Sequence, residues 1–585
     1  MIEQSDTEVL IVGAGPVGLS LAGDLGNRGR RCIVVERGDG VIEQPKMDMV
    51  GIRTMEFCRR WGLTEDVRNA GYNRDYPQDN VFLTSLRGFE IGRQVMPSMA
   101  LDRPPDVSPA QRERCPQNFF DPVLQRFACS RPGVEFRYRT EYLSHVADRG
   151  GITATVRDLQ SGDIRRIRAR YLVACDGGNS TIRGELGIGM TGRGLLNYTT
   201  NVIFRAENFN GLHNKTPGYR YMFIGPNGAW ATIVAIDGRD RWRMSILGDK
   251  TPQPRFTEAE IKALAHKMMG GEFDLEILSI LPWIRSELVA DSYRSGNVFL
   301  CGDAAHKTSP TAGLGMNTGI GDAVDLAWKL AAVLEGWGGE ALLDSYGEER
   351  IPIAKRITQF SSGNLDTMRR ATTNDAIYDD TEEGRATRKR IAVYLDEGLK
   401  REWFSMNMHL GTRYTDSSII QYDEAEDPAE ILAEFREAIH YRPTSRPGAR
   451  APHAWLRDGR SMLDLYGEGF VLLLFTPPDH LAVRTAFEAA ASSAGLPLRV
   501  MPIAQQEIAN LYDKRFVLVR PDGHVAWRGD AAPADVAAIL RKVSGNAERE
   551  SAVRTPAMEP IARGAGLEKP RAEADASLEI QGSKG

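Results

Sequence analysis

The sequence has little cysteine and no cysteine pair of the kind that redox or zinc sites use. Its six cysteines occur singly, and none forms a CxxC motif or a metal-ligand spacing. Cys32, Cys175 and Cys301 lie within apolar runs, so we expect them to be buried thiols. This pattern argues against a disulfide-rich secreted protein, against thiol-disulfide chemistry and against a metal centre.

The sequence also lacks a long apolar segment and an excess of either charge. No apolar run approaches the length of about 18 residues that indicates a transmembrane helix. With 73 basic and 78 acidic residues the net charge is near −5, which does not favour nucleic acid or an anionic membrane as a partner. The first apolar strand is reached by residue 8, which leaves no room for a signal peptide. We therefore expect a cytoplasmic protein whose partners are small molecules.

Three glycines near the N-terminus form a turn of the type that holds a dinucleotide. Gly13, Gly15 and Gly18 follow an apolar run and open a helix of small residues, and a second apolar run ends at Glu36. In a βαβ unit the first glycine permits the tight turn, the second lets a pyrophosphate approach, and the third lets helix and strand close, while the acid can bind a ribose. We predict dinucleotide binding. A glycine turn of purely structural use is the alternative.

Two later apolar strands also end in an acid beside small residues. Asp176 precedes two glycines and a helix start at Ser180, and Asp303 precedes a small-residue loop that runs to Asn317 and leads into a long helix. Ligands of open α/β sheets bind beyond the carboxyl ends of the strands, so we expect both acids to contact one extended dinucleotide. A plain turn capped by Ser180 is the other interpretation of the first segment. His306 has no triad partner or metal-ligand companion, and we interpret it as structural.

Residues 198–247 have a different pattern, with aromatic-rich alternating strands that predict an antiparallel sheet. Such a sheet beside a cofactor domain would make a wall for a flat apolar ligand. Tyr221, Arg241 and Arg243 are candidates for binding the polar group of that ligand, although alternation alone does not say which face each occupies.

Together these segments resemble the single-component FAD-dependent aromatic hydroxylases, the flavoprotein family that includes phenol hydroxylase and 3-(3-hydroxyphenyl)propionate hydroxylase. The resemblance spans residues 7–365 and rests on GAGPVGLSLA with Glu36, on CDGGNSTIRGELGI and on GDAAHKTSPTAGLGMNTGIGDAVDLAWKL. Residues after 450 resemble the thioredoxin-like C-terminal domain of the phenol hydroxylase branch. In this chain Thr476-Pro477-Pro478 follows the first strand of that domain, where a thioredoxin carries CxxC, so we expect a structural or oligomeric role.

The resemblance implies one FAD per chain and NAD(P)H as a co-substrate. No second GxGxxG occurs, so the nicotinamide is expected to bind transiently over the flavin. Lys46 stands where most relatives have arginine. The residues that the resemblance assigns to FAD are Gly13, Gly15, Gly18, Glu36, Arg37, Lys46, Gln117, Asp176, Asp303, Gly313, Gly315, Met316 and Asn317.

The resemblance also implies hydroxylation of a phenolic compound by O2 through a flavin hydroperoxide, which needs a dry pocket. Pro310 lies in the loop that would help to form this pocket. Asp48 occupies the place where phenol hydroxylase carries the aspartate thought to deprotonate its substrate. Because Met47 and Met49 flank it, we expect partial desolvation to raise the pKa of Asp48 and make it a better base. The alternative is an acid that interacts with a helix N-terminus.

The predicted fold class is α/β, with a Rossmann-like FAD-binding domain, an inserted antiparallel-sheet substrate domain and a C-terminal thioredoxin-like domain without CxxC. We also expect a homodimer. The predicted segments are 1–190 and 286–365 for the two parts of the FAD-binding domain, 191–285 for the substrate sheet, 366–445 for a helical region and linker, 446–545 for the thioredoxin-like domain, and 546–585 for a disordered tail.

The alternative function is a flavoprotein without oxygenase turnover, either a reductase or a protein that only holds FAD. No WxWxIP-like sequence supports a flavin halogenase, and no CxxC supports a disulfide reductase. Product formation that matches phenol-stimulated NAD(P)H oxidation would separate a hydroxylase from these alternatives.

Overall fold

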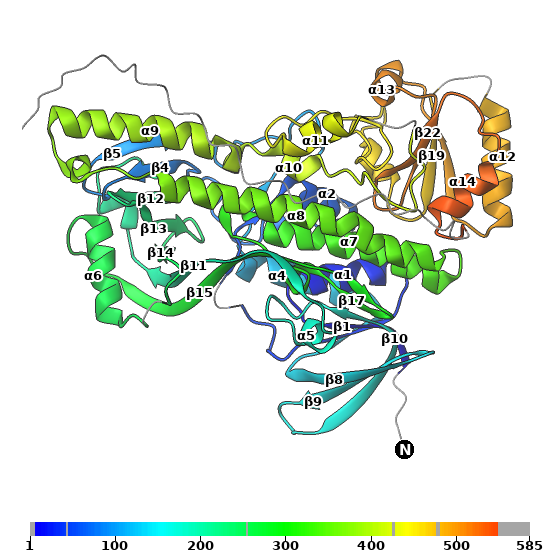
Figure 1. The fold of residues 1–585 in the computed structure, drawn as a ribbon, viewed down its shortest axis with the longest axis horizontal. Helices are drawn as coiled ribbons and strands as arrows, with labels where there is room; N and C mark the ends of the chain where they lie inside the picture. Colours follow the sequence, from blue (N-terminus) through cyan, green and yellow to red (C-terminus); the bar gives the residue numbers. More distant parts are fainter. Residues whose placement is uncertain (1–5, 43–44, 253–254, 424–426, 476–479, 548–585) are drawn as a thin grey trace, which may run out of the picture. The chain divides into compact units, whose positions relative to one another are not determined.

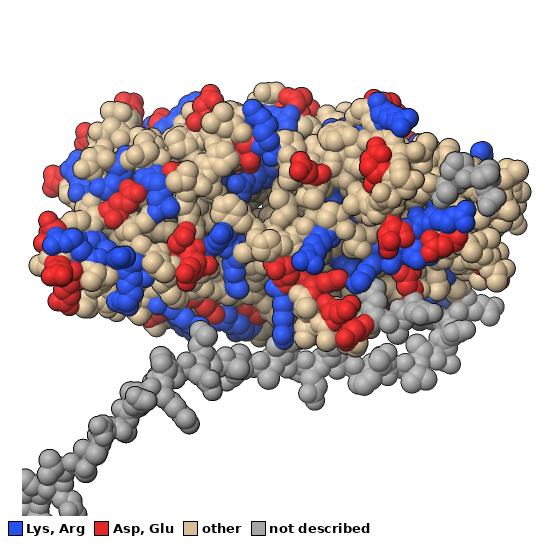
Figure 2. All heavy atoms as spheres, turned by 90° about the horizontal axis from the view of Figure 1, so that it is seen from above, with Lys and Arg blue, Asp and Glu red and all other residues tan. Residues whose placement is uncertain are grey.

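The structure is a computed structural model that describes residues 6–42, 45–252, 255–423, 427–475 and 480–547 (Figure 1). The described chain up to Ala547 forms one compact unit. The prediction for Thr476-Pro477-Pro478 lies outside the described residues, as does the predicted tail beyond Ala547. Figure 2 shows Lys and Arg interspersed with Asp and Glu on the face viewed from above, as the near balance of charge leads one to expect.

The first sheet has a parallel core made of short, fully buried apolar runs, which is typical of strands covered on both faces. In spatial order its strands are β16 (Arg294–Ser295), β17 (Val298–Leu300), β10 (Ile164–Ala174), β1 (Asp6–Val12), β2 (Cys32–Val35) and β7 (Val134–Arg137). A hairpin of β8 (Thr140–Asp148) and β9 (Gly151–Asp158) pairs antiparallel with β10. Helices α1 (Pro16–Asn27), α4 (Gln117–Cys129) and α7 (Gly315–Glu335) pack together beside the parallel strands.

The second sheet carries the aromatic strands. In spatial order it comprises β18 (His306–Lys307), β15 (Glu276–Ala290), β11 (Met190–Arg205), β14 (Arg241–Leu247), β13 (Gly228–Ala235), β12 (Arg220–Gly225), β4 (Asn80–Leu83) and β5 (Glu90–Gln94). Helix α6 (Glu258–Met269) buries Ile261, Ala265 and Met268 in the cluster under one face. Helices α8 (Glu340–Arg370) and α9 (Glu382–Trp403) contact the other side (Figure 1).

This sheet differs from the predicted domain of residues 191–285 in three respects. Strands β4 and β5 come from residues 80–94, which the prediction placed in the cofactor domain. The end of β15 and the whole of β18 come from residues after 285, which the prediction also placed in the cofactor domain. Strand β12 pairs with β4 in parallel. The difference has a simple reason, because short strands with weak alternation reveal neither their partner nor its direction. The pairing is set by the non-local contact with β12.

A short two-stranded sheet is separate from the two larger sheets. Strand β3 (Met49–Val50) pairs with β6 (Glu113–Arg114), and helix α2 (Ile52–Trp61) follows β3 directly. The remaining helices of the described chain before residue 440 are α3 (Thr64–Arg68), α5 (Thr181–Glu185), α10 (Met406–Leu410) and α11 (Pro428–Arg436). The loop before β3 contacts the second sheet, since Arg243 Nη1 on β14 donates to the carbonyl oxygen of Pro45 at 3.3 Å.

The C-terminal part has its own sheet, in the order β20 (Leu498–Pro502), β19 (Phe470–Leu474), β21 (Phe516–Val519) and β22 (Val525–Gly529). Strands β19 and β20 run parallel, and β21 runs antiparallel to both β19 and β22. Its helices are α12 (His480–Ser493), α13 (Gln506–Tyr512) and α14 (Val536–Val543). Within the described chain no helix combines the length and the apolar character needed to cross a membrane.

Buried ion pairs join this C-terminal part to the rest of the chain. Arg450 donates to Glu56 on α2 from two nitrogens, with Nε 2.9 Å from Oε2. Arg520 Nη2 donates to Glu349 Oε2 on α8 at 2.9 Å, and Lys329 Nζ lies 2.7 Å from the same oxygen. The side chains of Glu56 and Glu349 are 2% exposed or less, so the basic partners offset the cost of burying these carboxylates.

Candidate active site

The three glycine-rich segments meet beyond the carboxyl ends of β1, β10 and β17. Gly13 has a φ of +106°, and a Cβ on it would lie 2.3 Å from the carbonyl oxygen of Cys175. A Cβ on Gly18 would lie 2.0 Å from the carbonyl oxygen of Gly13, so these two positions require glycine for the fold itself. A Cβ on Gly15 would meet nothing within 4 Å. The space above Gly15 is therefore open to a ligand.

Two of the three acids at the strand ends, Asp176 and Asp303, keep acceptor oxygens without a partner among the described residues. Glu36 accepts from the N–H groups of Ala14 at 2.9 Å and Gly38 at 2.7 Å, which ties β2 to the glycine turn. Asp176 accepts from the N–H of Ile182 through one oxygen, and its other oxygen is buried without a partner. Asp303 is exposed and makes no hydrogen bond with any described residue.

The segment predicted to face the flavin contains the start of α7. This helix has Leu314 at its N-cap without a side-chain cap, so the first N–H groups, including those of Gly315 and Met316, lack an intrahelical acceptor. Gly313, with a φ of +65°, turns the chain into the helix. The side chain of Asn317 accepts from the N–H of Gly51 at 2.8 Å and donates to two carbonyl oxygens, so it fastens the loop after β3 to α7.

The other residues assigned to FAD lie at the loop before β3. Gln117 accepts from the backbone N–H of Lys46 and donates to Asp121, so its side chain braces this loop. Lys46 is exposed, with Nζ 5.8 Å from the centroid of the Trp283 ring. Arg37 is exposed in the turn after β2. The structure thus brings most of the predicted cofactor residues to one elongated region.

This region fits a flavin dinucleotide. The space above Gly15 is open. One oxygen of Asp176 can still accept a hydrogen bond, and the first N–H groups of α7 can still donate, because no described residue uses them. These features suit a pyrophosphate, a polyol and a ring carbonyl. Each contact of FAD with an individual residue remains a prediction.

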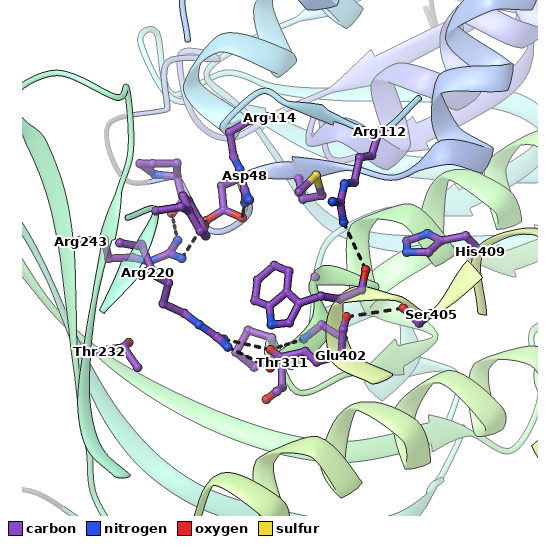
Figure 3. A pocket seen from close by; sticks show the side chains of 18 of the residues that line it. Asp48, Arg112, Arg114, Arg220, Thr232, Arg243, Thr311, Glu402, Ser405 and His409 are labelled. Carbon is purple, nitrogen blue, oxygen red and sulfur yellow. Dashed lines mark hydrogen bonds and ion pairs between the residues drawn. The ribbon is translucent and has the colours of Figure 1, made fainter. Parts of the chain in front are cut away.

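A cavity of about 530 Å³ lies against the second sheet, beside the loop before β3 and the start of α7 (Figure 3). One face of the second sheet forms its wall, and the wall residues are Leu281, Trp283 and Arg285 on β15, Asn201 and Ile203 on β11, and Arg243 and Ser245 on β14. Pro310, Thr311 and Gly313 line it from the glycine-rich loop, and Trp403 and His409 line it from the helical region. The cavity is large enough for an aromatic compound.

Asp48 lies at the cavity in a cluster of partners from distant parts of the chain (Figure 3). Arg243 Nη2 donates to Oδ2 at 3.1 Å, Arg114 Nη1 donates to Oδ1 at 3.2 Å, and the hydroxyl of Tyr219 also donates to Oδ2. The guanidinium of Arg114 stacks on the Tyr219 ring at 3.5 Å. The sequence predicted neither Tyr219 nor Arg114 as a site residue.

The electrostatics of this cluster correct the expected pKa of Asp48. Burial alone would raise it, but the charges of Arg243 and Arg114 and the hydrogen bond from Tyr219 outweigh burial, and the pKa is lowered. Asp48 is therefore ionised at neutral pH. The alternative of a helix-capping acid is also wrong, since α2 begins at Ile52 with Gly51 at its N-cap.

Two of the three predicted substrate residues do not line the cavity. Tyr221 is fully buried in the cluster on the α6 side, where its hydroxyl accepts from the N–H of Gly218 at 3.0 Å. Arg241 is exposed at the start of β14 and lies outside the cavity. Arg243 does line the cavity, through its ion pair with Asp48. The alternating pattern could not decide which of these residues line the cavity, because it distinguishes two faces of the sheet without identifying the face that borders the cavity.

A second ion pair at the cavity was also missed by sequence reasoning. Arg220 donates to both carboxylate oxygens of Glu402 at 3.0 Å, and Glu402 also accepts from the N–H of Ala312 (Figure 3). Ala312 has a φ of +72°, a conformation that costs a residue with a Cβ about 1 kcal/mol. The Glu402 contact holds this conformation in the loop that contains Pro310. No short sequence signal links residue 402 to this loop.

His306 lies in a buried network beneath the cofactor region. It contacts Asp322 through Nε2 at 2.8 Å, and Asp322 also accepts from Arg350 at 2.7 Å and from the N–H of Gly302. His306 is fully buried, so it packs within the protein as expected. Among the residues that the structure describes, no group of His, Cys, Asp and Glu could hold a metal ion.

The fold and the site define a protein with a region that fits a dinucleotide, beside a cavity large enough for an aromatic compound. Residues 6–361 match the FAD binding domain family, and residues 444–547 match the aromatic-ring hydroxylase C-terminal family. The chain is 34% identical over 559 residues to 4-methyl-5-nitrocatechol 5-monooxygenase of Burkholderia sp., with 92% of this chain and 96% of the relative covered. The chain therefore belongs to the single-component FAD-dependent aromatic hydroxylases, and it is a flavoprotein monooxygenase.

Solved structures agree with this assignment. RebC soaked with chromopyrrolic acid, with bound 7-carboxy-K252c, is 37% identical and has a TM-score of 0.86, with 93% of this chain and all of that chain covered. The flavin-dependent monooxygenase PieE, in complex with FAD and substrate, is 27% identical with a TM-score of 0.84, and 94% of this chain and all of that chain are covered. FAD is thus the cofactor.

Proposed function

We propose that this monooxygenase hydroxylates a phenolic ring bound in the cavity, and that Asp48 accepts the phenol proton through Tyr219. The observation that carries the proposal is the cluster of Asp48, Tyr219, Arg114 and Arg243 at the cavity wall. The relative from Burkholderia acts on a nitrocatechol, which is a phenolic compound. FAD supplies activated dioxygen for insertion into the ring once NAD(P)H has reduced it.

The low pKa of Asp48 is compatible with this role because Arg114 and Arg243 stabilise the negative charge both before and after the proton transfer. The Tyr219 hydroxyl donates to Asp48, so its oxygen is free to accept a hydrogen bond from the phenol. When the phenol proton passes to Tyr219, the proton of Tyr219 passes to Asp48. The negative charge then moves from the carboxylate to the phenolate, beside the same two arginines. A phenolate is more electron-rich and attacks an electrophilic oxygen more readily.

The remaining wall residues orient the ring and exclude water. Trp283 and Ile203 give the sheet side an apolar surface, and Pro310 and Trp403 add apolar surface from the glycine-rich loop and the helical region. Exclusion of water protects reactive oxygen from release as hydrogen peroxide. Asp48 and Pro310 are thus our candidates for the reaction site.

The test is a coupled assay with the purified yellow holoenzyme. A panel of phenols should stimulate NAD(P)H oxidation, and one hydroxylated product should form for each NAD(P)H consumed. A reductase or a protein that only holds FAD would give NAD(P)H oxidation without product, or none. Either result would overturn the proposal.

We also propose that residues 446–545 form a thioredoxin-like domain with a structural role, and that the enzyme is a homodimer. The strand order β20-β19-β21-β22, with only β19 and β20 parallel, supports the first part. No cysteine occurs after Cys301, so this domain has no thiol chemistry. Light scattering coupled to gel filtration tests the dimer.

A further inference from the structure

Arg285 is a buried cation at the cavity wall for which the described protein supplies no anion. The residue is only 8% exposed, and it shares one face of β15 with Leu281 and Trp283, which line the same cavity. Its guanidinium makes no hydrogen bond or ion pair with any residue that the structure describes, and its Nε is enclosed without an acceptor. An ionised group that is buried without a partner is costly, and proteins retain such groups at functional sites.

The acids of the cavity are already engaged by other arginines. Glu402 binds Arg220 through both oxygens. Asp48 binds Arg114 and Arg243. Asp102 lies 3.4 Å from Arg112. None of the acids among the described lining residues is therefore left for Arg285.

The surroundings of Arg285 are also cationic. Burial and the neighbouring charges of Arg243, Arg220 and Arg369 lower its pKa to about 10, against the opposing effect of Glu402, so it stays protonated at neutral pH. Among the described residues that line the cavity, seven are Lys or Arg and three are Asp or Glu. This balance favours a ligand with negative charge.

We propose that Arg285 binds a carboxylate substituent of the aromatic substrate, so that the substrate class is a phenolic carboxylic acid. This inference rests on the proposed function, since the ligand is the substrate of the same cavity. The Asp48 cluster and Arg285 stand on different strands of the wall, β14 carrying Arg243 and β15 carrying Arg285. The phenol hydroxyl and the carboxylate therefore have separate anchors. A guanidinium matches a carboxylate in shape as well as in charge.

The test compares acids with their uncharged amides in the oxidised holoenzyme without NAD(P)H. The pairs are 3-hydroxybenzoate with 3-hydroxybenzamide, and 6-hydroxy-2-naphthoate with 6-hydroxy-2-naphthamide. Binding is followed by the change in flavin absorbance and by calorimetry. A charge-assisted contact leads us to expect that the acid of at least one pair binds about 10- to 100-fold more tightly than its amide. Arg285→Met should reduce this ratio to about one, and Arg285→Lys should retain part of it.

Arg241→Met is the matched control, because Arg241 lies on the same sheet but outside the cavity, and it should keep the wild-type ratio. Flavin content verifies that each variant is folded. Equal binding of acid and amide by the wild type, failure of both acids to bind, or an unchanged ratio in the folded Arg285 variants would overturn the inference. The titration needs no turnover. A protein that prefers the acids but hydroxylates no phenol would therefore contradict the proposed function and not the role of Arg285.

Discussion

Replacement of Asp48 by asparagine tests the proton-acceptor role most directly. The substitution preserves the size of the side chain but removes the charge that Arg114 and Arg243 contact and the acceptor for a transferred proton. General-base assistance is worth about 10²- to 10⁴-fold in rate. Because the two arginines lower the pKa of Asp48, we expect the smaller effect, a loss of about 10²-fold in the hydroxylation rate at pH 7.

The assay measures hydroxylated product and hydrogen peroxide for each NAD(P)H consumed. Asp48→Asn should retain FAD and divert more NAD(P)H to peroxide. The loss should shrink as the pH approaches the phenol pKa, near 10 for a simple phenol, because the substrate then ionises in solution. Tyr219→Phe is the companion variant, since it removes the relay hydroxyl without changing a charge at the site, and it should also slow hydroxylation.

The opposite result is also informative. If Asp48 served only as the counterion of two arginines, Asp48→Asn would leave the site more cationic and would favour a bound phenolate. An unchanged hydroxylation rate and unchanged coupling at pH 7, with full FAD content, would therefore refute the proton-acceptor role.

Three further predictions concern the cofactor region and the C-terminal part. Gly15→Val should lose FAD but keep a normal circular dichroism spectrum, because its side chain enters the ligand space, whereas Gly18→Val should not fold. Full FAD content in Gly15→Val would contradict this prediction. Arg450→Met should lower stability by about 3–5 kcal/mol, measured by urea unfolding at pH 7, because it leaves Glu56 buried without its main partner. The pKa of Glu56 is about 2 in the folded protein, below its unfolded value, so the stability that Glu56 adds above about pH 4.5 should fall as the pH drops towards 2. This loss of stability should be smaller in Arg450→Met. Deletion of the chain after residue 445 should reduce soluble protein or stability more than the rate per bound FAD, as measured on any soluble fraction.

The cofactor region was predictable from sequence because its requirements are local. A positive φ at Gly13 and the close approach at Gly18 depend on residues within one βαβ unit, and such requirements leave a short motif. The acids at the ends of β10 and β17 are likewise read from the residues beside them. The parallel sheet and its helices follow from the same local patterns.

The cavity was not predictable in the same way, because its chemistry comes from residues that are far apart in the chain. The partners of Asp48 are 66, 171 and 195 residues away, and they reverse the pKa shift that burial alone suggested. Arg285 is informative only because no described residue pairs with it, which no sequence pattern displays. Tyr221 shows the limit of alternation, since a strand pattern identifies two faces but not which one borders the cavity.

The parallel pairing of β4 with β12 bears on how substrate preference can be exchanged between relatives. Four residues of each strand are in register, from Arg220 with Asn80 to Phe223 with Leu83, and β5 continues the sheet beyond them under α9. A chimaera that transplants residues 190–290 alone would force a foreign β12 against the native β4. A chimaera that preserves this sheet must therefore take residues 80–94 and the later strands from the same parent. About a hundred residues of the cofactor domain separate these two segments in the chain.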